Sequence, residues 1–308
     1  MNQTFYAVFG NPVLHSKSPQ LFSPLLENKP NSFFTRIRPR SAEDLVNIVR
    51  NLDIKGASIT SPFKESVLPL IDKIHPAAAE IGAVNCIRQK NGYIEGNNTD
   101  HAGVTGALCE SGASLQGMRV LVLGAGGAAK AAIYGLVHAG ANVTVSNRTF
   151  AKAEKLAASF GCDTIPWQEH AKSRSFDAIV SALLPEAMPP FMDKLEYGVF
   201  LDAIYKPSAL TAYTKNRGIP VIGGERWLIH QGAEAAAFFL GEKPEPVILE
   251  QKLNEKPDRD KLRIFVLTRS SLREFRQSAH DLVISGFGLN ETTINNLIDE
   301  EKELAFGG

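Results

Sequence analysis

Apolar positions along the chain alternate between short continuous runs and longer helix-like stretches. The run at residues 119–123, Arg-Val-Leu-Val-Leu, is typical of a buried parallel strand, and residues 128–139 predict a helix that Gly140 ends. Residues 142–146 alternate and are rich in β-branched side chains, which predicts the next strand. Strand, glycine turn, helix and strand in this order indicate a parallel sheet.

The same signals predict elements on both sides of this segment. Asn91-Gly92 favours a tight hairpin turn between strands at 84–88 and 93–96. Ser41 is expected to cap a helix that runs to Leu52. The other expected elements are strands at 5–9, 33–37, 56–60, 178–182, 199–202 and 220–222, and helices at 102–111 and 227–240.

This order predicts two α/β domains and a tail. Residues 1–100 form the first domain, on which the last helix of the chain could pack back, and residues 101–250 form a doubly wound parallel sheet of the Rossmann type. Residues 251–308 are expected to be an accessory tail without a catalytic group. Within and beside it we expect a linker at 242–260, a strand at 262–267 and an acidic helix at 291–304.

Composition narrows the class of protein. The 308 residues are 44% hydrophobic, which is enough for two cores. Basic and acidic residues number 33 each, so the chain has no net charge that would favour nucleic acid or a membrane surface. Three unclustered cysteines and seven scattered histidines argue against a disulfide framework or a metal site. Without a signal peptide or a bilayer-spanning stretch, we expect a cytoplasmic protein.

The glycine turn carries the first candidate chemistry. Gly124-x-Gly126-x-x-Ala129 matches the dinucleotide-binding pattern, in which the first glycine permits the tight turn and the second lets the backbone approach a pyrophosphate. The phosphates would meet free N–H groups at the start of the following helix. We therefore expect residues 124–128 to bind a dinucleotide; they are Gly124, Ala125, Gly126, Gly127 and Ala128.

The end of the next strand indicates which dinucleotide it is. An acidic residue here would accept from the ribose of NAD, whereas this chain has Asn147-Arg148-Thr149, with Lys152 one helical turn later. A guanidinium can bind the 2′-phosphate of NADP through two charge-assisted hydrogen bonds. The sequence therefore predicts NADP. In the alternative interpretation Arg148 is only a solvated residue at a helix start and Thr149 its cap.

Several short polar motifs surround the glycine turn in a fixed order. They are Gly10-Asn11-Pro12-Val13-Leu14-His15-Ser16-Lys17-Ser18-Pro19, Thr60-Ser61-Pro62-Phe63-Lys64, Gly82-Ala83-Val84-Asn85, Asn98-Thr99-Asp100, Asp202 through Tyr205 and Pro207, and His230-Gln231-Gly232. Together, and in this order, they resemble the shikimate dehydrogenase family over about residues 5–250. Leu210 stands at the family's threonine position, and Thr211 follows one residue later.

The resemblance implies a reversible reduction of 3-dehydroshikimate to shikimate with NADPH, in aromatic amino acid and chorismate biosynthesis. It implies Lys64 and Asp100 as the catalytic pair. Reduction of a ketone builds negative charge on its oxygen, so a nearby cation that can also donate a proton is needed, and Lys64 could fill both roles. Asp100 could orient the Lys64 side chain and accept a hydrogen bond from a substrate hydroxyl. Taken singly, a lysine such as Lys64 is most often a solvated surface residue and Asp100 a helix N-cap, but their occurrence together with the other motifs favours the catalytic interpretation.

The resemblance also implies how the substrate is bound. Ser16 and Ser18 match a pair that hydrogen-bonds the substrate carboxylate, although Ser18-Pro19 is also an ordinary helix start. Gly224 matches a close backbone approach to the nicotinamide. The other residues implied to contact substrate are Ser58, Thr60, Asn85, Thr99, Tyr205 and Gln231.

Three features depart from the family pattern. Ser58 stands where many members have asparagine, as in the dehydrogenase part of fusions with dehydroquinate dehydratase, and its shorter hydroxyl changes the contact to substrate. Residues 181–184, Ser-Ala-Leu-Leu, replace the polar Asn-Ala-Thr-Ser beside the cofactor. The tail beyond Leu253 exceeds the usual end of the family.

Alternative functions stay open. The substrate could be quinate or another ring-hydroxylated acid, since the same contacts would serve relatives of shikimate. The chain could instead be a catalytically silent NADP-binding regulator, with the altered 181–184 loop as its signature. A small-molecule substrate, no nucleic acid or membrane partner, and a monomer or homodimer are expected.

Overall fold

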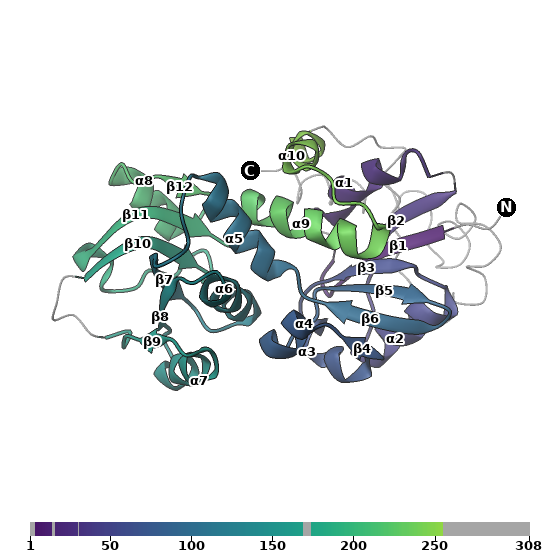
Figure 1. Cartoon of the computed structure of the whole chain (residues 1–308), viewed down its shortest axis with the longest axis horizontal. Coiled ribbons are helices and arrows are strands. Elements are labelled where there is room, and N and C mark those ends of the chain that lie inside the picture. The colour runs from purple at the N-terminus through teal and green to yellow at the C-terminus, as the bar shows by residue number, and fades with distance from the viewer. Residues whose placement is uncertain (1–3, 14–15, 30, 169–173, 255–308) are drawn as a thin grey trace. The chain divides into compact units, whose positions relative to one another are not determined.

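The computed structural model describes residues 4–13, 16–29, 31–168 and 174–254, and these form two units (Figure 1). The first unit contains the described residues up to Asn98 together with residues 232–254. The second unit is Thr99–Gln231. The strand expected at 262–267 and the helix expected at 291–304 lie outside the described residues.

A mixed six-stranded sheet in the order β2-β1-β3-β5-β6-β4 organises the first unit. β1 pairs in parallel with β2 and β3, whereas β5 pairs antiparallel with both β3 and β6. The expected hairpin is confirmed: Asn91 and Gly92 have φ of 52° and 79°, as a tight turn with two left-handed residues requires. The strands are β1 (Thr4–Phe9), β2 (Ser32–Ile37), β3 (Gly56–Ile59), β4 (Lys73–Ile74), β5 (Cys86–Lys90) and β6 (Tyr93–Asn97).

Helices complete the core of the first unit. The predicted cap of α2 (Ala42–Asn51) is confirmed, because the Ser41 hydroxyl accepts from the Asp44 N–H at 3.2 Å. Leu45 and Val49 of this helix are fully buried against the sheet. The other helical segments are α1 (Ser18–Phe22), η1 (Ser23–Leu26), α3 (Phe63–Ser66), η2 (Leu68–Leu70) and α4 (Pro76–Ile81).

The linker expected at 242–260 is wrong over residues 246–254, which form helix α10 (Pro246–Asn254). Proline and charged residues suggested a solvated segment, but Pro246 stands at the first helical position, where proline is tolerated. Leu249 is fully buried, and the helix packs beside α1 (Figure 1). Gly232 of helix α9 (Gly224–Leu240) lies against both helices, because a Cβ atom there would lie 2.3 Å from Leu21 of α1 and 3.8 Å from Leu249 of α10.

The second unit has six strands, all pairing in parallel, in the order β12-β11-β10-β7-β8-β9. This order confirms the doubly wound sheet. From β7 the chain adds strands first on one side, as β8 and β9, and then on the other side, beginning with β10, so the strand order switches between β7 and β10. Val120 and Val122 enter one core cluster, while Leu121 and Leu123 enter another on the opposite face, so β7 is buried on both sides. The strands are β7 (Arg119–Leu123), β8 (Asn142–Ser146), β9 (Asp163–Thr164), β10 (Arg174–Ser181), β11 (Leu195–Asp202) and β12 (Val221–Ile222).

The helical segments of the second unit cover this sheet. They are α5 (Asp100–Glu110), α6 (Gly127–His138), α7 (Phe150–Phe160), η3 (Met192–Lys194), α8 (Ala209–Asn216) and the first half of α9 (Gly224–Leu240). The predicted helix 102–111 thus begins two residues earlier, at Asp100, and 227–240 begins three earlier, at Gly224.

Helix α9 contributes to both units. In the second unit a Cβ on Gly103 of α5 would lie 2.2 Å from the Trp227 ring, and one on Gly106 would lie 2.6 Å from the His230 ring, so these glycines let the helices approach closely. In the first unit Phe239 packs on β3, where a Cβ on Gly56 would lie 2.4 Å away. One continuous helix therefore belongs to two cores.

Candidate active site

The glycine turn lies at the carboxyl end of β7, where the strand order reverses. Gly124 has φ of 118°, and a Cβ there would lie 3.1 Å from the Ala182 carbonyl oxygen, so the position requires glycine. Gly126 caps α6, and a Cβ there would meet nothing within 4 Å. The turn therefore presents accessible backbone at the N-terminus of a 12-residue helix, as a pyrophosphate requires.

Exposed cations follow β8, the neighbouring strand. Arg148 and Lys152 are both exposed, and the Asn147 amide donates to the Thr149 carbonyl at 2.9 Å. Thr149 precedes α7 but makes no capping hydrogen bond with its side chain. Thr149 therefore stands at the cap position that the alternative interpretation gives it, without a side-chain capping bond, and the exposed Arg148 fits both a solvated residue and a phosphate ligand.

The two serines expected to bind a carboxylate lie together in the first unit. Ser16 and Ser18 are 8% and 7% exposed. The Ser16 hydroxyl donates to the Ser18 hydroxyl at 3.1 Å, and the Ser18 N–H donates to the Ser16 hydroxyl at 3.3 Å. Ser18 also begins α1, so the helix-start role and the site role apply to the same residue.

Backbone hydrogen bonds at and just beyond the end of β3 hold Lys64 beside Val84, and Asn85 beside Ile59, the residue before Thr60. The Val84 N–H donates to the Lys64 carbonyl at 2.8 Å, and the Ile59 N–H donates to the Asn85 carbonyl at 2.6 Å. A Cβ on Gly10 would lie 2.4 Å from the Thr60 methyl, so glycine makes room for this side chain. Ser58, half-buried on β3, pairs with Cys86 of β5 in the strand next to Asn85.

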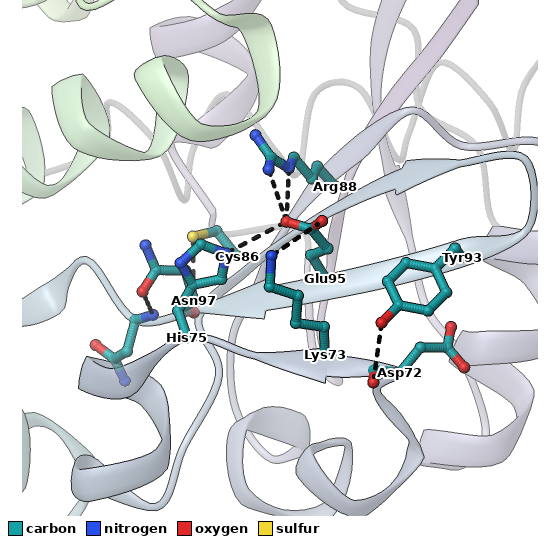
Figure 2. Close-up of polar contacts among 9 residues, drawn as sticks. Asp72, Lys73, His75, Cys86, Arg88, Tyr93, Glu95 and Asn97 are labelled. Atoms are coloured by element: carbon teal, nitrogen blue, oxygen red, sulfur yellow. Dashed lines mark hydrogen bonds and ion pairs between the residues drawn. The ribbon is translucent and has the colours of Figure 1, made fainter.

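A charged cluster that the sequence did not reveal connects β4, β5 and β6 (Figure 2). Glu95 of β6 accepts from Arg88 at 2.7 Å and 3.0 Å, and it lies 3.3 Å from His75 and 3.6 Å from Lys73. Burial raises the pKa of the Glu95 carboxyl, but hydrogen bonds from Arg88 and His75 and the charges of Arg88 and Lys73 outweigh it and hold this pKa below its ordinary value. Within β6, Glu95 lies two residues before Asn97, the last residue of the strand.

In the second unit the expected site residues gather around the start of α5. Asp100, 8% exposed, is the first helical residue rather than the N-cap, a position that Thr99 occupies. The Thr99 hydroxyl donates to the Gln231 side-chain oxygen at 3.4 Å, and the Gln231 amide donates to the Leu228 carbonyl at 3.2 Å. Asp100, Thr99 and Gln231 are thus brought together within this unit.

Tyr205 adds an aromatic hydroxyl to the same unit. Although the residue is 37% exposed, shielding of its phenol from water by the surrounding chain raises the pKa of this group, and the carboxylates of Glu225 and Asp100 raise it further. Glu225 was missed by sequence reasoning, and its only signal was an acidic residue directly after Gly224. A Cβ on Gly224 would lie 2.6 Å from the Ile204 carbonyl carbon. Close packing of Gly224 on the Ile204 backbone is therefore enough to require glycine at this position, with or without a nicotinamide.

The segment that carries Tyr205 is fixed by Asp202 at the end of β11. The Asp202 carboxylate accepts from the Ser208 hydroxyl at 2.6 Å and from the Thr211 hydroxyl at 3.0 Å. Leu210, which occupies the family's threonine position, faces the core and is 1% exposed. The hydrogen bond to Asp202 comes instead from Thr211, one residue later. In the altered 181–184 loop, Ser181 is buried and Leu184 is 70% exposed.

The described segments lack the features of two other classes of site. Nowhere in them do three or more His, Cys, Asp or Glu side chains gather as metal ligands would. None of their helices combines the length and the apolar character needed to cross a bilayer.

The strand order and the glycine turn define a dinucleotide-binding protein of the Rossmann class, and comparison with known proteins narrows the class. Residues 8–87 match the model of the shikimate dehydrogenase substrate binding domain, and residues 107–188 match that of shikimate / quinate 5-dehydrogenase. A shikimate dehydrogenase (NADP(+)) from Aquifex aeolicus is 35% identical over 77% of this chain and 91% of that protein. The chain belongs to the shikimate dehydrogenase family.

Solved structures agree with this assignment. The crystal structure of shikimate dehydrogenase from Aquifex aeolicus superposes with a TM-score of 0.76 and 31% identity, covering 83% of this chain and all of that one. Shikimate 5-dehydrogenase from Thermus thermophilus, in complex with NADP(H) and shikimate, gives a TM-score of 0.73 and 32% identity, covering 81% of this chain and 98% of that one.

Proposed function

We propose that this protein is an NADP-dependent shikimate dehydrogenase that reversibly reduces 3-dehydroshikimate to shikimate. The observation that carries the proposal is the 35% identity to a relative of that name over 91% of its length. The glycine turn and exposed Arg148 support the cofactor, and the buried serine pair supports an acid substrate. The first unit would supply most substrate contacts and the second would hold NADP.

The residues around the glycine turn fit NADP. The backbone of residues 124–128 would receive the pyrophosphate, and Asn147, Arg148, Thr149 and Lys152 would surround the 2′-phosphate. Gly224 would let its backbone approach the nicotinamide. NADPH, when bound, supplies the hydride.

Lys64 and Asp100 would carry the proton chemistry. As hydride adds to the substrate ketone, the carbonyl oxygen gains negative charge, which the Lys64 ammonium stabilises and then quenches by giving up one proton. In the oxidation direction the neutral amine takes that proton back. The Asp100 carboxylate accepts a hydrogen bond from a substrate hydroxyl and so orients the ring. Ser16 and Ser18 would donate to the substrate carboxylate, and Ser58, Thr60, Asn85, Thr99, Tyr205 and Gln231 would contact the ring substituents.

One assay tests the proposal. Purified protein is mixed with NADP and shikimate, and NADPH formation is followed by absorbance, with NAD as the alternative cofactor. We expect turnover with shikimate and a preference for NADP. Protein that binds NADP but turns over neither shikimate nor quinate would contradict the proposal and favour the silent regulator.

Quinate is the second candidate substrate, because the matched family model names both acids. Ser58 bears on this choice, since its hydroxyl has one donor and a shorter reach than an asparagine amide. Comparing kcat/KM for the two acids separates them. We further propose that the protein acts as a monomer or homodimer, which sedimentation would establish.

A further inference from the structure

Behind the serine pair lies a buried arginine that the proposed chemistry does not use. Arg36 of β2 is 1% exposed, although arginine is among the residues least often found fully buried. One guanidinium nitrogen, Nη2, donates to the Ser16 carbonyl oxygen at 2.6 Å and to the Gln20 Oε1 at 3.2 Å. Arg36 thus connects the strand to both ends of the turn that contains Ser16 and Ser18.

Gln20 gives a second observation at this turn. Its side chain is 7% exposed, and the bond from Arg36 to Oε1 fixes which way the amide points. Among the residues that the structure describes, Gln20 Nε2 has no hydrogen-bond partner. A buried donor without an acceptor is unfavourable, so an acceptor-rich group such as a carboxylate, directly or through water, would be favoured here.

We infer that Arg36 is a positioning residue for the carboxylate of the substrate and that it acts through the turn of Ser16, Ser18 and Gln20. The inference rests on the proposed function, which assigns the carboxylate to the serine pair.

Arg36 acts by holding the binding turn in place before substrate arrives. A charge-assisted bond to the Ser16 carbonyl holds the backbone of that residue, and the Ser16 hydroxyl in turn orients the Ser18 hydroxyl at 3.1 Å. An ionised carboxylate only accepts hydrogen bonds, so it binds best where the backbone already places hydroxyl donors within its reach. Ordering these donors before binding reduces the entropy that binding must overcome.

The carboxylate is remote from the reacting ketone, so its binding energy is shared equally by ground and transition states. Loss of Arg36 should therefore raise KM and leave kcat largely unchanged. A general structural weakening would instead affect substrates with and without a charged carboxylate alike.

The test compares Arg36→Met and Arg36→Lys with Phe34→Leu, a control on the same strand and face of the sheet whose ring stacks on Phe22 at 5.0 Å and lies 6.4 Å from Phe239. Each holoenzyme is assayed with shikimate and with the uncharged shikimate methyl ester. For Arg36→Met we expect KM for shikimate to rise about tenfold to a hundredfold, with kcat and the ester KM within about threefold of the parent. Arg36→Lys should fall between the two, and Phe34→Leu should show no difference between substrates.

An unchanged KM for shikimate, an equal loss for acid and ester, or a fall in kcat alone would overturn the inference. If neither Arg36 variant folds, Gln20→Met provides the same comparison, with an expected rise in shikimate KM of about threefold to tenfold and no change for the ester. Failure of the proposed function gives a different result, because the parent enzyme itself would then not oxidise shikimate.

Discussion

Lys64 is the residue on which the proposed chemistry most depends. Its backbone carbonyl is fixed by Val84, while its amine would serve as proton donor. General acid–base groups contribute about 10²–10⁴ in rate, so Lys64→Ala should lower kcat by that factor and change shikimate binding less. Steady-state kinetics measure both. Lys55→Ala removes a lysine that pairs with Asp53 and should keep normal kcat, and a Lys64 variant with normal kcat would refute the assignment.

Arg148 is the residue that we predict to set the cofactor preference. It is exposed after β8, and losing a charge-assisted phosphate contact costs about 1.5–3 kcal/mol, so Arg148→Ala should weaken NADP binding about tenfold to a hundredfold. NAD binding should change little, since NAD lacks the 2′-phosphate. Fluorescence titration with both cofactors measures this. The matched control is Arg119→Ala, which lies at the start of β7, at the end of that strand away from the glycine turn. Equal losses of NADP and NAD binding in Arg148→Ala would contradict the prediction.

The three cysteines differ in reactivity. Burial raises the pKa of the Cys162 thiol to about 11, and the charge of Asp163 adds to this shift. Cys86 is buried, whereas Cys109 is exposed on α5. Because the thiolate is the reactive form, iodoacetamide near pH 8 should modify Cys109 well before Cys162. Peptide mass spectrometry reads out each site, with Cys109→Ser as the control, and early labelling of Cys162 would disagree with its environment.

At the scale of elements, the Glu95 cluster ties β4, β5 and β6 together. Because the folded pKa of Glu95 lies below its ordinary value, its contribution to stability is present above about pH 5 and is lost as the pH falls through the lowered value. Glu95→Gln resembles the protonated acid. Urea unfolding should therefore show a less stable variant at neutral pH and convergence with the parent in acid. A stability gap that stays constant with pH would contradict this account.

Elements with local signals could be predicted from the sequence. The strand 119–123, the strand 142–146 and the Asn91-Gly92 hairpin each depend on neighbouring residues, and each was confirmed. Helix α10 was missed because its stability comes from burying Leu249 beside Leu21 and Gly232, which are distant in sequence. The two-residue strands β4 and β9 are too short to show a pattern.

The candidate site divides in the same way. Ser16, Lys64, Asp100 and Arg148 stand in motifs whose order the sequence displays, and their roles stay predictions. Arg36 and Glu225 stand in no motif, so the sequence does not single them out. Folding places Arg36 beside the Ser16 carbonyl and Glu225 near the Tyr205 phenol, and only these neighbours make the two residues relevant.

At the scale of the whole molecule, the tail beyond α10 is predicted to supply no catalytic group. A chain that ends at Asn254 should keep kcat and KM within about twofold, because all residues of the proposed site precede it. A chain that ends at Gly241 loses α10 and exposes the surface that buries Leu249, which should cost about 2–5 kcal/mol of unfolding free energy. Thermal unfolding and kinetics of the pair measure this, and an inactive but folded 1–254 protein would place an essential group in the tail.

Helix α9 makes the first unit the last to be completed during synthesis. The ribosome releases Thr99–Gln231 as one stretch, so the second unit can close its sheet at once. The earlier unit must wait for Phe239, against which Phe22 and Phe34 pack at 5.1 Å and 6.4 Å between ring centroids. At ordinary translation speeds this interval is on the order of ten seconds. During it the nascent chain carries an uncovered aromatic surface, the kind of surface that chaperones recognise.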